Sequence, residues 1–225
     1  RLAQGDLTSQ GTVFALSGTL PYPDARTRQS RGPVKLDASL KAQSLSQGAN
    51  QLQNLDATLG LESDLKGWID TFTLAGQTRL TARADRLVSG EVRAQGLDFE
   101  SQGSTLALSR EANRPARWQV RGPARLQLAQ VTSGETRLNK AHLSTQQMIL
   151  GGLGQAVEAE GPLLLQVDQI QSGDLDLRQA RGQMQLDMVR DGLARISLAG
   201  DLNIAQGGFK GLGPVGPDDA PELAA

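Results

Sequence analysis

Cysteine is absent from this chain of 225 residues, and histidine occurs only once. Without cysteine the protein has no disulfide bonds, no thiolate metal site and no cysteine nucleophile. A single histidine also leaves few ligands for a transition metal. We therefore expect neither a metal nor a cofactor.

Aromatic residues are scarce as well, at 3% of the chain (two Trp, one Tyr and four Phe). Aromatic side chains usually supply much of the core of a globular protein. The apolar content consists instead of Leu, Ala, Val and Ile, spread evenly along the sequence. This distribution suits an extended sheet with one apolar face better than a compact core.

No charge of one sign dominates, because 23 basic and 24 acidic residues are interleaved and give a net charge of −1. This pattern lacks the basic footprint of a nucleic-acid-binding protein, so we expect no nucleic-acid partner. No segment reaches the roughly 18 apolar residues of a membrane span, and no signal peptide is visible. Since the chain opens on Arg1, we interpret it as a piece of a longer protein whose anchor or export signal lies outside it.

One sequence motif occurs four times, and it consists of alternating apolar and polar residues followed by a turn of Ser or Gln with Gly. The copies span Gly32–Gly48, Gly76–Gly90, Gly122–Gly134 and Gly161–Gly173. Their closing glycines are 90−48=42, 134−90=44 and 173−134=39 residues apart. A period near 40 residues indicates one repeated supersecondary unit. A degenerate fifth copy precedes these at Leu7–Gly11, since 48−11=37.

The composition of the motif also suits a helix, because Leu, Ala, Gln and Arg all favour helices. Alternation decides for strands, since Leu36, Ala38, Leu40 and Ala42 alternate with polar residues, and a helix would place charges on every side. Gly-Pro pairs at Gly32, Gly122 and Gly161 mark strand limits in this interpretation. We predict three or four short antiparallel strands per repeat, with residues 1–206 forming one array.

Three segments fall outside the repeat pattern. Pro21–Gly32 and Ser109–Arg117 are polar, contain proline, and are predicted to be loops at the sheet edge. The end of the chain, Gly207–Ala225, is rich in Gly and Pro and is predicted to be a flexible tail or linker.

Candidate catalytic groups are few. His142 lies in an alternating segment between Ala141 and Leu143, which predicts a solvated strand residue. Two carboxylate pairs, Glu158 with Glu160 and Asp174 with Asp176, have the i,i+2 spacing of one strand face, and a polar outer face explains them. These residues indicate no acid–base site.

Glycine-rich stretches occur at Gly151–Gly154 and Gly207–Gly213. Neither has the spacing of a phosphate-binding loop with its Lys and Ser or Thr, and no hydrolase signature is present. We expect loops at both places, and we expect that the protein is not an enzyme.

The apolar face of the alternating segments has two explanations. It is the inner side of a β-sandwich, or it lines a curled sheet whose apolar side stays open. The long array, the shortage of large side chains and the alanines among the leucines favour the open trough.

The repeat resembles those of the AsmA-like family of bacterial inter-membrane lipid-transfer proteins. The resemblance lies in Gly-Pro-x-x-Leu-x-Leu, the Ser-Gly turn and the following Leu-x-x-x-x-Leu-x-Leu, and it covers Leu7 to Ile204. It implies an all-β fold, an elongated antiparallel β-sheet curled into a taco-like groove. It also implies a periplasmic protein, anchored in the inner membrane by a segment outside this chain, that carries phospholipids toward the outer membrane.

The leading hypothesis is therefore a segment of a lipid-transfer groove whose partners are phospholipid acyl chains and the two membranes. It leaves room for a small periplasmic or outer-membrane partner. The predicted lining residues are Leu36, Leu40, Leu80, Leu126, Leu128, Leu163, Leu165, Val167, Met184, Leu186, Ile196 and Leu198. Two alternatives stay open, a structural or adhesive β-solenoid stalk and a lipopolysaccharide-bridge groove.

Overall fold

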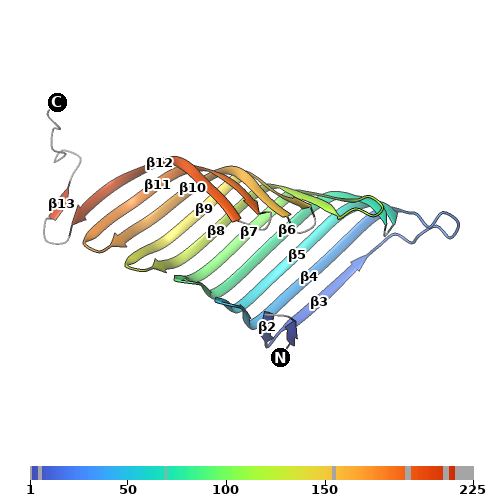
Figure 1. Ribbon diagram of the computed structural model, residues 1–225, viewed down its shortest axis with the longest axis horizontal. Helices are drawn as coiled ribbons and strands as arrows, with labels where there is room; N and C mark the ends of the chain where they lie inside the picture. The colour runs from blue at the N-terminus through green and yellow to red at the C-terminus, as the bar shows by residue number, and fades with distance from the viewer. Residues whose placement is uncertain are drawn as a thin grey trace.

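The computed structural model describes residues 2–4, 7–68, 70–153, 156–190, 194–209 and 213–215, with side chains for 7–68, 70–153, 156–187, 201 and 203–207. The described residues contain no helix, and their thirteen strands form one antiparallel sheet. The strands follow one another in nearly sequential order and curl over at one end, so that the sheet forms an open trough (Figure 1). The predicted all-β fold is confirmed.

The short strands lie at the two ends of the array and the long ones between them. In chain order the strands are β1 (Leu2–Gln4), β2 (Leu7–Gln10), β3 (Val13–Thr19), β4 (Ser30–Gln47), β5 (Asn50–Trp68), β6 (Thr71–Ser89), β7 (Val92–Arg110), β8 (Arg117–Ser133), β9 (Thr136–Leu153), β10 (Ala156–Ser172), β11 (Leu175–Arg190), β12 (Ala194–Phe209) and β13 (Gly213–Val215).

The four closing glycines of the repeat form tight hairpin turns, as predicted. Gln47 pairs with Asn50 across the turn at Gly48, and Ser89, Ser133 and Ser172 make the equivalent pairs. The glycines have φ from 55° to 59°, and the first central position of a type II′ turn requires such a value. All four turns lie on the same side of the trough, which we call the turn rim; the opposite ends of the strands form the loop rim (Figure 1).

The predicted strand lengths are wrong. The strands β4 to β12 contain 16 to 19 residues, so each repeat is one long hairpin and not three or four short strands. The Gly-Pro pairs lie inside β4, β8 and β10. The ladder tolerates their missing N–H because the register shifts beside Pro123 and Pro162, while Pro33 pairs only with β5 after β3 has ended.

A line of left-handed residues crosses the sheet at every second strand, and we call it the left-handed row. It consists of Gly11, Asn54, Gly96, Lys140 and Gln179, with φ from 49° to 61°. In each hairpin the residue follows the turn glycine by six positions, since 54−48, 96−90, 140−134 and 179−173 all equal 6. The left-handed row is therefore part of the repeat.

The left-handed row changes which sequence positions face the trough. Leu138 and Ala141 lie on either side of Lys140 and are three positions apart. Their partners on the next strand, Ile170 and Val167, are also three positions apart. All four belong to one hydrophobic cluster, together with the buried Ala180. The apolar face thus continues across the left-handed row although strict alternation fails there. Gly11 belongs to this row and does not close a hairpin, so the predicted fifth turn is wrong.

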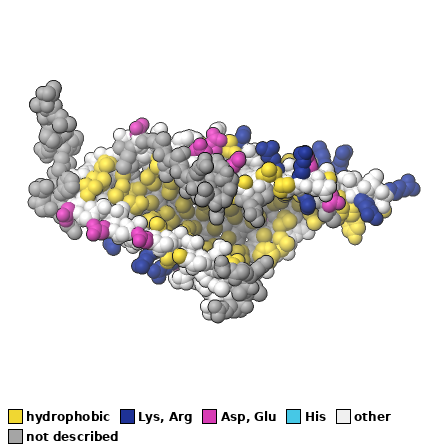
Figure 2. All heavy atoms as spheres, viewed as in Figure 1, with side chains coloured by type: hydrophobic (Ala, Val, Ile, Leu, Met, Phe, Trp, Pro, Cys, Tyr) yellow, Lys and Arg dark blue, Asp and Glu magenta, His cyan; other side chains and the backbone are white. Residues whose placement is uncertain are grey.

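Small side chains account for most of what is buried. The buried hydrophobic residues are Val34, Ala42, Ala84, Ala94, Ala141, Ala159, Val167 and Ala180. No second sheet packs on the first among the described residues, which rules out the β-sandwich interior for this part of the chain. The larger leucines therefore face the open side of the trough, where Figure 2 shows hydrophobic side chains gathered between charged rims.

The loops are shorter than predicted. The β3–β4 loop spans residues 20–29 and the β7–β8 loop spans residues 111–116, so both lie on the loop rim between long strands. At the end of the array the predicted tail is wrong in part, because Gly207 to Phe209 belong to β12 and pair with β13. The rest of the predicted tail, 210–212 and 216–225, lies outside the described residues.

Candidate functional site

The strand register places the predicted lining positions on one face of the sheet. Leu40 starts a row of directly opposed residues that crosses the sheet from β4 to β11. The row consists of Leu40, Ala57, Ala82, Phe99, Leu126, Leu143, Leu165 and Gly182. Directly opposed residues of an antiparallel sheet point to the same side. The row therefore forms a continuous apolar lining across eight strands.

The other predicted positions join this face by alternation or by direct pairing. Leu36, Leu128, Leu163 and Val167 lie two or four residues from members of the row, and Leu80 pairs through Leu59 with Ala38. Met184 lies opposite Leu163, and Leu186 is two residues further along β11. Positions 196 and 198 lie opposite 188 and 186, but their side chains are outside those described. That these residues bind lipid stays a prediction.

The sequence interpretation missed lining residues on the returning strand of each hairpin. Leu59 and Leu61 of β5 face Ala38 and Leu36, and Phe99 and Leu143 lie in the row itself. These residues alternate with polar neighbours as regularly as the predicted ones do. Period-2 counting over both strands of each hairpin would have found them.

Many lining side chains are only partly covered. Leu36, Leu40, Leu126, Leu128, Leu163 and Leu165 are half-buried, whereas Leu59, Leu80 and Ile204 are exposed at 39%, 37% and 42%. Most of their neighbours on the same strands, two residues away, are also apolar or small, so water meets a largely hydrocarbon surface. Contiguous apolar surface of this kind marks interaction sites in soluble proteins.

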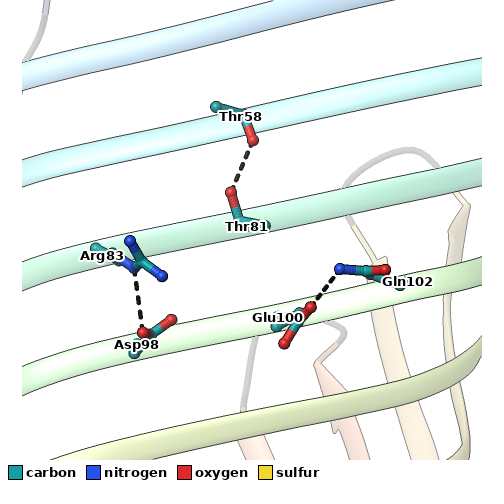
Figure 3. Close-up of polar contacts among 6 residues, drawn as sticks. All are labelled: Thr58, Thr81, Arg83, Asp98, Glu100 and Gln102. Carbon is teal, nitrogen blue, oxygen red and sulfur yellow. Dashed lines mark hydrogen bonds and ion pairs between the residues drawn. The ribbon is translucent and has the colours of Figure 1, made fainter.

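The opposite face is polar and carries cross-strand charge pairs. Lys41 and Asp56 approach to 3.0 Å, and Arg83 and Asp98 to 3.1 Å. Figure 3 shows the Arg83–Asp98 pair beside the bonded hydroxyls of Thr58 and Thr81, which lie 2.7 Å apart. These exposed pairs stabilise the sheet only slightly.

Two hydroxyl groups on the apolar face are used internally. The Thr78 hydroxyl donates to the Ser104 carbonyl at 3.3 Å, and the Ser101 hydroxyl donates to the Pro123 carbonyl at 2.9 Å. The irregular ladder beside Pro123 frees that carbonyl from strand pairing. Because each of these hydroxyls has a partner in the sheet, the groups are not free to bind a ligand.

The described residues hold no group of three or more His, Cys, Asp or Glu side chains that could bind a metal. His142 is exposed between Gln127 and Gln166 on the polar face. Glu158 and Glu160 are exposed, while Asp174 lies in a turn and Asp176 accepts hydrogen bonds from Gln169 at 2.9 and 3.0 Å.

One carboxyl group has a perturbed pKa, and it lies on the loop rim. The N–H groups of Thr27 and Arg26 donate to the Asp24 carboxylate at 2.8 and 2.9 Å, and so does the Thr27 hydroxyl at 3.0 Å. These hydrogen bonds, that from the Thr27 N–H first, hold the pKa of Asp24 below its ordinary value. They order the β3–β4 loop.

Comparison with protein-family models, with curated proteins and with solved structures found no match. No helix in the described part of the chain has the length and apolarity needed to cross a membrane. The candidate site is thus the concave apolar face, defined by geometry alone.

Proposed function

We propose that this chain is a segment of a hydrophobic groove that carries phospholipids between the inner and outer membranes of a bacterium. The observation that carries the proposal is the single sheet whose apolar face is continuous from β4 to β11 and is covered by no other described element. The resemblance of the repeats to the AsmA-like family supports the same function, and with it a periplasmic location.

The dimensions suit acyl chains. Nine strand spacings separate β3 from β12 along the trough, which corresponds to about 43 Å. One acyl chain extends about 15 Å, half of the roughly 30 Å hydrocarbon core of a bilayer. The groove therefore holds two or three acyl chains end to end, with the strands wrapped around them.

The apolar lining lowers the cost of moving lipid through water. Each exposed methylene costs about 0.8 kcal/mol, so an acyl chain of about 16 carbons costs on the order of 12 kcal/mol when it is fully hydrated. The row of directly opposed residues from Leu40 to Gly182 consists mainly of Leu and Ala, and it contains neither a tryptophan nor a charged residue. Because every step offers similar contacts, a lipid can slide without a deep trap.

Photo-crosslinking tests the assignment of the two faces. A photoreactive amino acid at Leu128 or Leu165 should capture phospholipid in cells, because both positions line the trough. The matched controls are the adjacent positions Gln127 and Gln166, which lie on the polar face in register with each other through His142. Equal capture at all four positions would contradict a lipid-binding face.

A charge in the groove tests transport itself. Leu128→Asp or Leu165→Asp should block lipid transfer, whereas Gln127→Asp should leave it unchanged. Organic extraction with mass spectrometry identifies the bound molecule: a stalk protein would yield no stoichiometric lipid, and a lipopolysaccharide bridge would yield lipopolysaccharide. Normal transfer by all three variants would reject the groove.

A further inference from the structure

The most exposed apolar side chains of the described residues are gathered at one corner of the trough. They are Val13, Phe14, Leu16, Leu20 and Tyr22, with exposed fractions from 59% to 95%. The next most exposed large apolar residue, Leu153, reaches only 53%. The five residues cover the open edge strand β3 and the start of the β3–β4 loop, and we call them the docking corner. In Figure 1 this loop projects beyond the end of the sheet.

The apolar tip of the docking corner is held in place. Pro21 and Pro23 flank Tyr22, which is 95% exposed, and the Ser30 hydroxyl donates to the Pro21 carbonyl at 3.1 Å. The Asp24 N–H donates to the Gln29 carbonyl at 2.8 Å, which closes the loop behind the tip. Tyr22 is therefore presented outward by an ordered loop.

Basic side chains surround this tip. Between residues 20 and 31 the chain has Arg26, Arg28 and Arg31 against the single carboxylate of Asp24, a net charge of +3−1=+2. All three arginines are exposed, and none forms an ion pair within the described part of the chain. Figure 2 shows basic and hydrophobic side chains together at this end of the molecule.

We propose that the docking corner binds the surface of an anionic phospholipid bilayer. Tyrosine is favoured at the level of lipid head groups, and arginines near the surface are attracted to anionic lipids. Phe14 and Leu16 lie opposite Leu40 and Ala38, so the exposed apolar strip runs directly into the groove lining. The proposal goes beyond transport along the groove, because it identifies a surface through which the protein contacts a membrane.

A protein strand is the competing occupant of the β3 edge, since β3 pairs with β4 alone among the strands that the structure describes. Edge strands do accept further strands. Strand addition would cover β3, but Leu20 and Tyr22 lie beyond the end of that strand, and the arginines belong to the loop. A bilayer accounts for the edge strand, the aromatic tip and the charge together.

Single-cysteine labelling tests the contact, because the chain has no native cysteine. An environment-sensitive fluorophore on Tyr22→Cys should shift to the blue when phosphatidylcholine–phosphatidylglycerol vesicles are added, and the shift should fade as salt is raised. The same fluorophore on Ala112→Cys, in the β7–β8 loop of the same rim, should not respond. Vesicles of phosphatidylcholine alone should give a much smaller shift at position 22.

Vesicle cosedimentation of the full chain separates the contributions. Arg26→Gln and Arg28→Gln should each weaken binding about fivefold at low salt. Tyr22→Ser should weaken it about tenfold, because the side chain no longer enters the interface. Arg114→Gln, in the β7–β8 loop, is the matched control and should bind like the original chain. Since Tyr22 is almost fully exposed, its replacement leaves the fold intact.

No shift at position 22, equal binding to neutral vesicles, or full binding by Tyr22→Ser would overturn the proposal. So would a stable complex through β3 with another chain that leaves the vesicles unbound. Photo-crosslinking of lipid at position 165 is measured separately in Tyr22→Ser. The membrane contact of the docking corner can therefore be disproved while the groove still binds lipid.

Discussion

Some single residues have backbone conformations that lower the stability of the folded protein. Asn54, Lys140 and Gln179 are left-handed although they are not glycines, and such a residue costs about 1–2 kcal/mol relative to an ordinary conformation. Gly11 and Gly96 occupy the equivalent positions without that cost. The left-handed row is therefore required by the fold rather than favoured by each residue.

Replacing Gln179 with glycine should stabilise the protein. Gln179→Gly relieves the left-handed strain but adds chain entropy to the unfolded state, so we expect the free energy of unfolding to rise by about 0.5–1 kcal/mol. Chemical denaturation measures the change. The control Gln179→Ala keeps a β-carbon and should give no gain; an equal gain for Ala and Gly would argue against backbone strain.

The β3–β4 loop should lose order in acid. The pKa of Asp24 is lower in the folded chain than its ordinary value of 3.8, so the carboxylate favours the ordered loop above that pH. Its contribution disappears as the pH falls through the lowered pKa. An NMR titration of the Asp24 carboxyl carbon should show this low pKa together with shifts of the Thr27 and Arg26 amides. An ordinary pKa for Asp24 would show that these hydrogen bonds do not form in solution.

At the scale of the strands, close packing limits which residues the apolar face accepts. A β-carbon on Gly76 would overlap the carbonyl oxygen of Glu62 and the Cα of Ser63 on the neighbouring strand. On Gly60 of the polar face, the nearest atom to an added β-carbon is Asp37 Oδ1, at 3.5 Å. These two glycines thus have different structural roles.

Gly76→Ala should therefore lower the free energy of unfolding by about 1–3 kcal/mol, the usual cost of overpacking. Gly60→Ala is the matched control and should be close to neutral. Thermal and denaturant unfolding of both variants measures the difference. If the two substitutions have the same effect, the strands are not in contact at Gly76 as the structure has them.

Much of the hairpin was predictable from the sequence. The turn glycines Gly48, Gly90, Gly134 and Gly173 and the inward positions of the first strand follow from turn chemistry and alternation. Strand length did not follow, because Gly-Pro pairs usually end strands and here lie at irregular pairings. The left-handed row was missed because Lys140 and Gln179 give no compositional signal. The spacing of three between flanking apolar residues, as in Leu138 and Ala141, would have revealed it.

At the scale of the whole molecule, the proposed function gives bound lipid the place of a protein core. Few large side chains are fully buried in the described residues, so the lining gains packing contacts only when the groove is occupied. A ligand that binds the folded state raises its stability by mass action.

Removal of lipid should accordingly lower the melting temperature. At a lipid concentration about 100 times the dissociation constant the gain is about 2.7 kcal/mol, which corresponds to about 5–10 °C for a chain of this size. Differential scanning calorimetry of delipidated and reloaded protein tests this. Leu165→Asp should lose the gain and Gln166→Asp should keep it; a lipid effect that survives Leu165→Asp would place the lipid elsewhere.

The constant distance of six residues between turn glycine and left-handed row makes each hairpin interchangeable with its neighbours. Duplication or loss of one hairpin changes the length of the trough by two strand spacings, about 10 Å, and leaves the lining in register. Copying a gene segment can therefore lengthen or shorten the trough in evolution with no redesign of its apolar surface.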